Sequence, residues 1–105
     1  MSVEMGIKNK RTGEYQVVPV STAQGFRDHW IPASEAIGLQ MVQHLHDGTF
    51  TTIRPQEIPP ILAELKRLRA FVLDKPDAAW ITVRIDRIVA AFETTNPAEY
   101  EYDFG

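Results

Sequence analysis

The sequence contains no cysteine. This absence excludes a disulfide scaffold, a thiolate zinc site and a cysteine nucleophile. The sequence also lacks an apolar run near the roughly 20 residues of a membrane span, and its opening stretch, MSVEMGIKNKR, has no hydrophobic segment typical of a secretory signal. We therefore expect a cytoplasmic protein with no membrane partner.

An excess of positive charge is also missing. The chain has 11 Lys and Arg against 14 Asp and Glu, a net charge of −3. Residues 93–105 contain only acidic charges, so the rest of the chain is close to neutral and attracts nucleic acid weakly. Basic residues between positions 60 and 90 are interspersed with acidic ones, without a phosphate-binding loop or an RNA-binding motif. Those on the two helices predicted in this region are Lys66, Arg67, Arg69, Arg84 and Arg87. We predict no nucleic-acid partner.

What is present is an ordinary globular composition. The 105 residues are 44% hydrophobic and 24% charged, which predicts one domain over residues 1–105. Catalytic signatures do not occur: the sequence has no Gly-x-Ser-x-Gly, no Walker loop and no His-Glu-x-x-His. We predict no catalytic residue.

Two hairpins are predicted in the first half. Val3, Met5 and Ile7 alternate with polar residues, and residues 15–20 resume the strand pattern after a loop that ends in Gly13. Pro19 cannot donate to a strand ladder and indicates an edge or a strand end. Residues 39–46 and 49–53 flank Asp47-Gly48, a pair that favours a type I′ turn and a second hairpin.

Three helical segments are predicted. Residues 21–24 form a capping box, followed by a helix that Pro32 should kink or split. Its buried face would be Phe26, Trp30, Ala33 and Ile37. A second helix should start near Pro60, with the apolar stripe Ile61, Leu62, Leu65, Leu68 and Val72. A short turn ending in a capping Asp77 leads to a third helix with the stripe Ile81, Ile85, Ile88 and Phe92. The last two helices should pack as an antiparallel hairpin.

Residues 98–104 have the pattern of an amphipathic strand. One face consists of Tyr100, Tyr102 and Phe104, and the other of Glu99, Glu101 and Asp103. This strand either completes the sheet of its own chain or pairs with a partner's sheet or a second copy, making a homodimer. The complete prediction is an α+β domain of order ββαββααβ. It has a four- or five-stranded antiparallel sheet from two hairpins and the terminal strand, with helices mainly on one face.

Two functions follow as hypotheses. The first is a small cytosolic, non-enzymatic protein-binding module, an adaptor or an inhibitor of the immunity type, with a basic protein partner. Its binding residues would be Tyr100, Tyr102, Phe104, Glu99, Glu101, Asp103 and Trp80. Trp80 could instead be an edge residue of the core.

The second function is a small metal-dependent enzyme or metal sensor. His44 and His46 share one face of the expected strand, next to Asp47, and all three are proper ligands for a divalent zinc or iron ion. His29 or a carboxylate would complete the site. The alternative is that both histidines are ordinary strand residues and Asp47 serves only the turn. On that hypothesis the protein has no cofactor.

Overall fold

A three-stranded antiparallel sheet forms one layer of the protein, in the order β2-β1-β3. The computed structural model describes residues 2–105. Its strands are β1 (Ser2–Asn9), β2 (Tyr15–Thr22) and β3 (Tyr100–Phe104). The predicted four- or five-stranded sheet is therefore wrong, whereas the α+β class is correct.

The first hairpin forms as predicted. β1 and β2 pair antiparallel, from Lys8 opposite Tyr15 next to the turn to Ser2 opposite Thr22 at the far end. Gly13 has a φ of +77°, a conformation that glycine adopts without steric cost. The carboxamide oxygen of Asn9 accepts hydrogen bonds from the turn's backbone N–H groups. Pro19 lies inside β2, which is an edge strand of the sheet.

The second predicted hairpin does not form. Residues 42–44 make a 3-10 turn instead, and the segment that follows contributes only one isolated bridge, from Ile53 to Tyr102. A type I′ turn needs positive φ at both central residues. Gly48 has a φ of +86°, but Asp47 is not among the residues with positive φ. The Asp47 carboxylate instead accepts hydrogen bonds from the N–H and hydroxyl of Thr49, which closes a local turn.

Glu64 holds the segment that was expected to be a strand. Its carboxylate accepts backbone hydrogen bonds from Gln40, Met41 and Val42, at 2.9 to 3.2 Å. N–H groups engaged in this way are not available to a strand ladder. Leu39, Val42 and Leu45 are all buried, and their spacing of three is that of a 3-10 helix.

Glu64→Ala should therefore loosen residues 39–45. Hydrogen bonds to a charged group contribute about 1.5–3 kcal/mol, so we expect a loss of that order in the free energy of unfolding, measured with urea. Glu35→Ala is the matched control, because Glu35 is an exposed helical glutamate and its loss should cost less than about 0.5 kcal/mol. Equal effects of the two substitutions would contradict the anchoring role of Glu64.

The predicted helix around Pro32 is divided, but without a sharp break. α1 (Ala23–Gly25) leads into a π-helical turn (Phe26–Trp30) and then α2 (Ile31–Ala36), which has Pro32 in its first turn. Proline has no N–H for an α-helical bond, and π turns accommodate such interruptions. The N-cap is Thr22, whose hydroxyl accepts from the N–H of Gly25 at 2.9 Å, one residue beyond the predicted Ser21.

The helical hairpin agrees with the prediction in its packing and differs at its boundaries. A 3-10 turn (Pro55–Glu57) precedes α3 (Ile58–Val72), and α4 (Ile81–Glu93) follows a turn. α3 thus starts before Pro60, and the N-cap of α4 is Trp80 rather than Asp77. The predicted stripes are buried apart from Leu62, which is half-buried. Arg69 on α3 bonds Asp86 on α4 at 2.8 Å.

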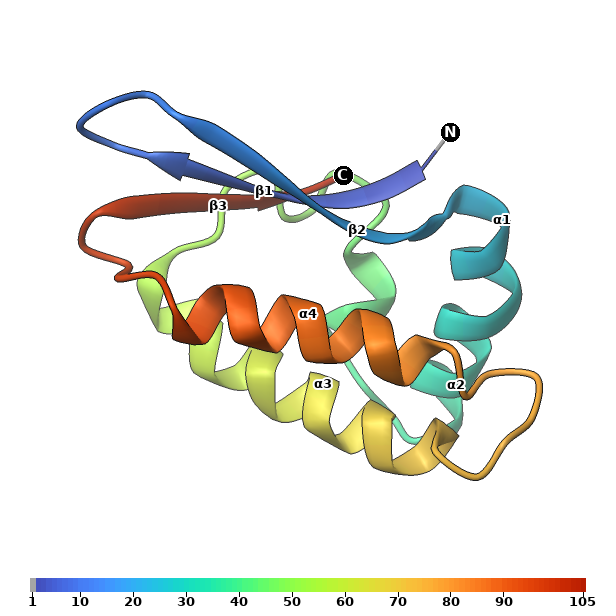
Figure 1. Cartoon of the computed structure of the whole chain (residues 1–105). Helices are drawn as coiled ribbons and strands as arrows, with labels where there is room; N and C mark the ends of the chain where they lie inside the picture. Colours follow the sequence, from blue (N-terminus) through green and yellow to red (C-terminus); the bar gives the residue numbers. More distant parts are fainter. Residues whose placement is uncertain (1) are drawn as a thin grey trace.

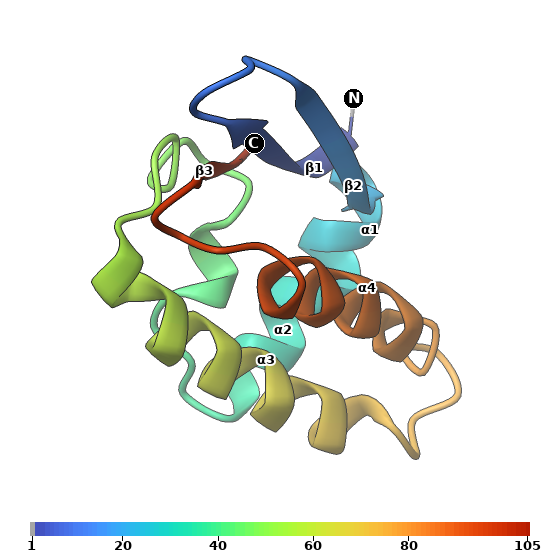
Figure 2. The same cartoon turned by 60° about the vertical axis from the view of Figure 1, so that its left-hand side comes forward.

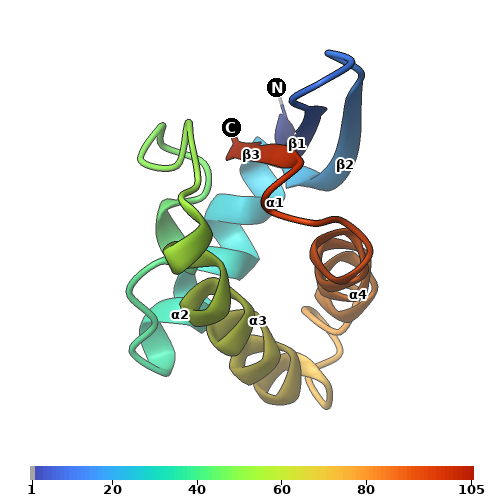
Figure 3. The ribbon, with the colours of Figure 1, turned by 90° about the vertical axis from the view of Figure 1, so that its left-hand side faces the viewer.

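The helices lie on one face of the sheet (Figures 1 and 2). In Figure 1, α4 lies beneath the strands with α3 below it; in the end view, α3 lies to the left of α4 and slightly lower, and α1 and α2 are farther back (Figure 3). The core fills the space between the layers, where the inward residues of β1, Val3, Met5 and Ile7, are at most 2% exposed. Among the described residues, no helix is both long and apolar enough to cross a bilayer.

Candidate protein-binding surface

The opposite face of the sheet carries no helix among residues 2–105 (Figure 1). The strand register shows which residues lie side by side across this face, and each such set forms a row. Gly6 of β1 lies between Val17 of β2 and Asp103 of β3, and Lys8 lies between Tyr15 and Glu101. We call these residues, together with Glu4 and Pro19 of the next row, the outer face.

Apolar side chains are exposed at one side of the outer face. Tyr15 is 56% exposed and Val17 is 48% exposed, and both belong to β2. The acidic side chains Glu4 and Glu101 are exposed beside them, and Asp103 is half-buried. Tyr15 and Val17 with carboxylates around them form a mixed apolar and acidic surface. Aromatic residues are enriched in protein interfaces, and charged residues lie mainly at the polar rim.

Tyr15 lies flat across the outer face. Its hydroxyl is 3.3 Å from each carboxylate oxygen of Asp103, so the side chain spans β1 and reaches β3. This close approach needs glycine at position 6, because a Cβ there would overlap the Tyr15 hydroxyl and the Asp103 carboxylate. Partial burial and the charge of Asp103 raise the pKa of the Tyr15 hydroxyl above its usual value, so the ring stays neutral at physiological pH.

The predicted binding strand completes the sheet of its own chain. β3 pairs with β1 from Met5 opposite Phe104 to Asn9 opposite Tyr100. Its other edge is also occupied: Ile53 donates to the Tyr102 carbonyl at 2.9 Å, and Phe104 donates to the Phe50 carbonyl at 2.8 Å. β3 therefore has no free edge for a partner's sheet or a second copy.

The predicted binding side chains divide into two groups. Tyr102 and Phe104 are 2% and 1% exposed and pack on Phe92, with ring centroids 5.0 and 6.3 Å away. They belong to the core. Tyr100 is half-buried, and Glu99 and Glu101 are exposed. Of the predicted set, Glu101 and Asp103 lie on the outer face.

Trp80 lies at the edge of the core, away from the outer face. Its side chain is 39% exposed, and its ring meets His29 edge-on, with centroids 5.8 Å apart. Its indole N–H donates to the carbonyl of Asp77 at 3.1 Å. Trp80 as a partner contact stays a prediction that the fold does not test.

The structure separates the predicted metal ligands. His44 and Asp47 form a pair, with Nδ1 and Oδ2 2.7 Å apart. Burial raises the pKa of Asp47, but hydrogen bonds from Thr49 and His44 outweigh it and bring the pKa to about 2. His46 packs instead on the ring of Phe26, with centroids 5.0 Å apart. No group of three His, Asp or Glu suited to a metal ion occurs among the described residues.

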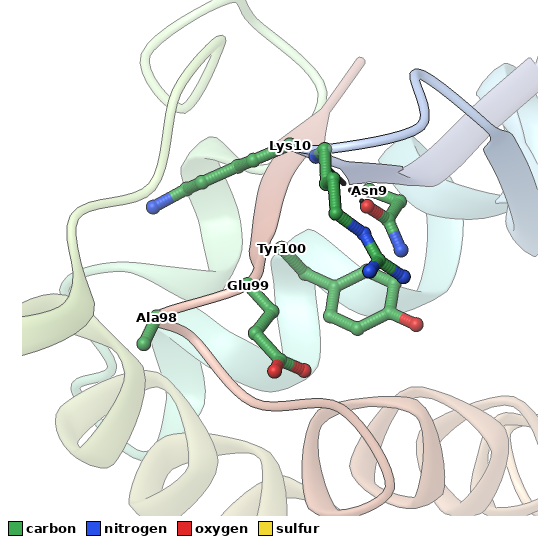
Figure 4. A pocket seen from close by; sticks show the side chains of 6 residues that line it. Asn9, Lys10, Ala98, Glu99 and Tyr100 are labelled. Atoms are coloured by element: carbon green, nitrogen blue, oxygen red, sulfur yellow. Dashed lines mark hydrogen bonds between the residues drawn. The ribbon is translucent and has the colours of Figure 1, made fainter.

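A surface hollow of about 360 Å³ lies where the first hairpin turn meets the start of β3. Figure 4 shows Lys10 and Glu99 extending in different directions from these two segments, with Tyr100 beside them. Arg11 also lines the hollow. Charges of both signs surround it, so its lining does not select an anionic or a cationic ligand.

The sequence patterns did not single out Tyr15, Val17 and Gly6 as functional candidates. Gly6 was the available signal, because a glycine inside a strand often marks a close approach. Pro19 was another, since it indicates an edge strand. The comparisons with known proteins add no candidate, because no family model, curated protein or solved structure matches the chain.

Proposed function

We propose that this protein is a small cytosolic, non-enzymatic protein-binding module, an adaptor or an inhibitor of the immunity type. The surface that binds is the outer face of the sheet, and the partner presents a basic patch. One observation carries the proposal: exposed Tyr15 and Val17 lie beside carboxylates on a sheet face that no helix of the described chain covers.

The charges of the outer face favour a basic partner. Glu4, Glu101 and Asp103 are acidic, and Lys8 is the single basic side chain in these rows. Complementary charge speeds the encounter and selects the partner, whereas apolar contacts supply affinity. The strands also hold the outer face rigid, so less conformational entropy is lost on binding than with a flexible loop.

Charge reversal on the outer face should strongly weaken binding. We expect the double variant Glu4→Lys and Glu101→Lys to bind about tenfold less partner than the native chain, or less still. The attraction between the acidic outer face and a basic partner becomes repulsion. The measurement is a native pull-down quantified by mass spectrometry. Both residues are exposed and bear no side-chain hydrogen bond among those described, so the fold should survive, which circular dichroism checks.

The matched control is Glu35→Lys with Glu93→Lys. Both glutamates are exposed on helices, and the net charge changes by the same amount. This control and the double variant His44→Ala and His46→Ala should both retain the partner. The proposal fails if the partner is bound equally by the outer-face variant and by the helix control, or if the histidine variant alone loses it.

A further inference from the structure

β2 is an open edge of the sheet, and its register shows which backbone groups point outward. Asn9 donates to the Glu14 carbonyl at 2.8 Å and its own carbonyl accepts from the Gly13 N–H at 2.9 Å, so Asn9 occupies a hydrogen-bonded position toward β2. Such positions alternate with non-bonded positions along an antiparallel ladder. Tyr15, Val17 and Pro19 are thus in non-bonded positions, and their backbone groups point away from β1.

Proline fits this arrangement. The backbone groups of Pro19 point away from β1, so the missing N–H of proline costs no hydrogen bond to β1. At the open edge Pro19 presents only its carbonyl. The outward groups are the N–H and C=O of Tyr15, the N–H and C=O of Val17, and the C=O of Pro19. Among the described residues, nothing pairs with β2 on this side.

The open edge also lacks charge. Residues 15–22 read YQVVPVST, without one Lys, Arg, Asp or Glu. Open edges are commonly guarded by charged side chains, by proline or by bulges. β2 has Pro19 and an irregular register beyond it, but the stretch before Pro19 has no such guard. β3 shows the contrast: its outer edge is covered by residues 50–53 of its own chain. An uncharged, uncovered strand of eight residues is suited to pairing.

We propose that β2 pairs antiparallel with β2 of a second copy, about a two-fold axis at Val17. Val17 then faces Val17 of the second copy, and Tyr15 faces Pro19. The two Val17 residues exchange both of their N–H and C=O groups, and each Tyr15 N–H meets a Pro19 carbonyl. Of the outward groups, only the Tyr15 carbonyl is left to water, because proline offers it no donor.

The side chains are compatible with this pairing. On the outer face, Val17 packs on Val17 across the axis, which is an apolar contact. The Tyr15 ring points away from the axis, over β1 to Asp103, so Pro19 of the second copy meets no bulky side chain there. No charged side chain occurs within the paired segment, so no like charges oppose each other. The edge of β2 is uncharged, so a second uncharged β2 edge matches it electrostatically. A strongly charged partner strand would not match it.

Dimerisation would join two sheets into one of six strands. The outer faces of both copies would become continuous, with their carboxylates on both sides of the axis. This goes beyond the proposed function, because the dimer forms without any other protein. A small interface of this type falls at the weak end of specific association, so we expect dissociation on dilution.

Sedimentation tests the pairing directly. At high concentration the native chain should have twice the 11.9 kDa of one chain, and it should dissociate on dilution. Val17→Lys should stay at the monomer mass, because it places two ammonium groups at the axis. Val83→Lys is the matched control, since Val83 on α4 is 52% exposed against 48% for Val17. It should dimerise like the native chain.

A cross-link gives a second test that does not depend on destabilising the edge. The chain has no cysteine, so Val17→Cys introduces a single thiol. Hydrogen-bonded antiparallel pairs have Cα atoms about 5.5 Å apart, within the range of a disulfide. Mild oxidation should give a covalent dimer much faster for Val17→Cys than for Val83→Cys.

Two results would overturn the proposal: a native chain that remains monomeric up to millimolar concentration, or equal cross-linking of the two cysteine variants. Neither result bears on the proposed function, whose charge-reversal test uses residues outside the β2 edge. Conversely, a dimer that forms normally with no protein partner bound would leave the pairing intact and count against partner binding.

Discussion

Deletion of residues 98–105 is expected to unfold the protein. The deletion removes Tyr102 and Phe104, which are 2% and 1% exposed, together with the whole ladder between β3 and β1. Removal of one buried aromatic side chain costs about 3–5 kcal/mol, and a small domain has about 5–15 kcal/mol in total. Losing two such rings and a strand exceeds most of that range.

Circular dichroism and one-dimensional NMR of the truncated chain check this expectation. The control is Glu99→Gln with Glu101→Gln, which removes two exposed charges of the same segment and should leave the fold and stability nearly unchanged. A truncated chain that keeps a cooperative thermal transition would contradict the assignment of β3 to its own sheet. A change in oligomeric mass with the fold intact would instead favour pairing of β3 between chains.

Trp30→Ala is expected to lower the free energy of unfolding by about 3–5 kcal/mol. Trp30 is fully buried, and its ring stacks on Phe26 with centroids 5.4 Å apart and planes inclined by 16°. Phe26 and Trp30 are four residues apart, a spacing that places both rings on the same side of a helical segment. Alanine would leave a cavity that the helix, fixed by Pro32 and by the bond from Ser34 to the Trp30 carbonyl, cannot close easily.

Trp80→Ala is the matched control within the same chain. Trp80 is 39% exposed, so its loss should cost about 1 kcal/mol or less, since it removes only partial burial. Urea unfolding followed by far-ultraviolet circular dichroism compares the two variants. If Trp80→Ala proved as destabilising as Trp30→Ala, the assignment of Trp30 to the core and Trp80 to its edge would be wrong.

The sequence was sufficient for the elements whose apolar residues repeat with the period of the backbone. The alternation of Val3, Met5 and Ile7 predicted β1, and the spacing of Ile81, Ile85, Ile88 and Phe92 predicted the buried face of α4. The alternating aromatics likewise predicted β3. In each case the period of apolar residues equals the period of the backbone, so the buried face can be derived from the sequence alone.

The sequence could not exclude the second hairpin, because the residue that prevents it, Glu64, lies far along the chain. Asp47-Gly48 favoured a turn between strands, but Glu64 takes the backbone N–H groups of residues 40–42. That interaction joins positions more than twenty residues apart, and local patterns do not contain it. The spacing of Leu39, Val42 and Leu45 was the one local sign of a 3-10 turn.

The outer face was missed for a similar reason. Val17, Gly6 and Asp103 come from three strands, and only the pairing of β1 with both neighbours brings them into one row. The sequence placed emphasis on the acidic and aromatic strand as a whole, whereas the fold buries two of its aromatics and leaves carboxylates on the surface. Of the predicted acidic residues, Glu101 and Asp103 lie on the outer face, and the exposed aromatic ring on that face is Tyr15 of β2.

The sheet order β2-β1-β3 has a consequence for synthesis. β1 is the central strand, yet it cannot pair with β3 until β3 has been synthesised. Met5, for example, pairs with Phe104, near the other end of the described chain. Ribosomes add about 5–20 residues per second, so for several seconds the nascent hairpin exposes one edge of β1 as well as the edge of β2. During that interval the protein is most vulnerable to mispairing, and a chaperone that shields strand edges would matter more to its yield than to its final stability.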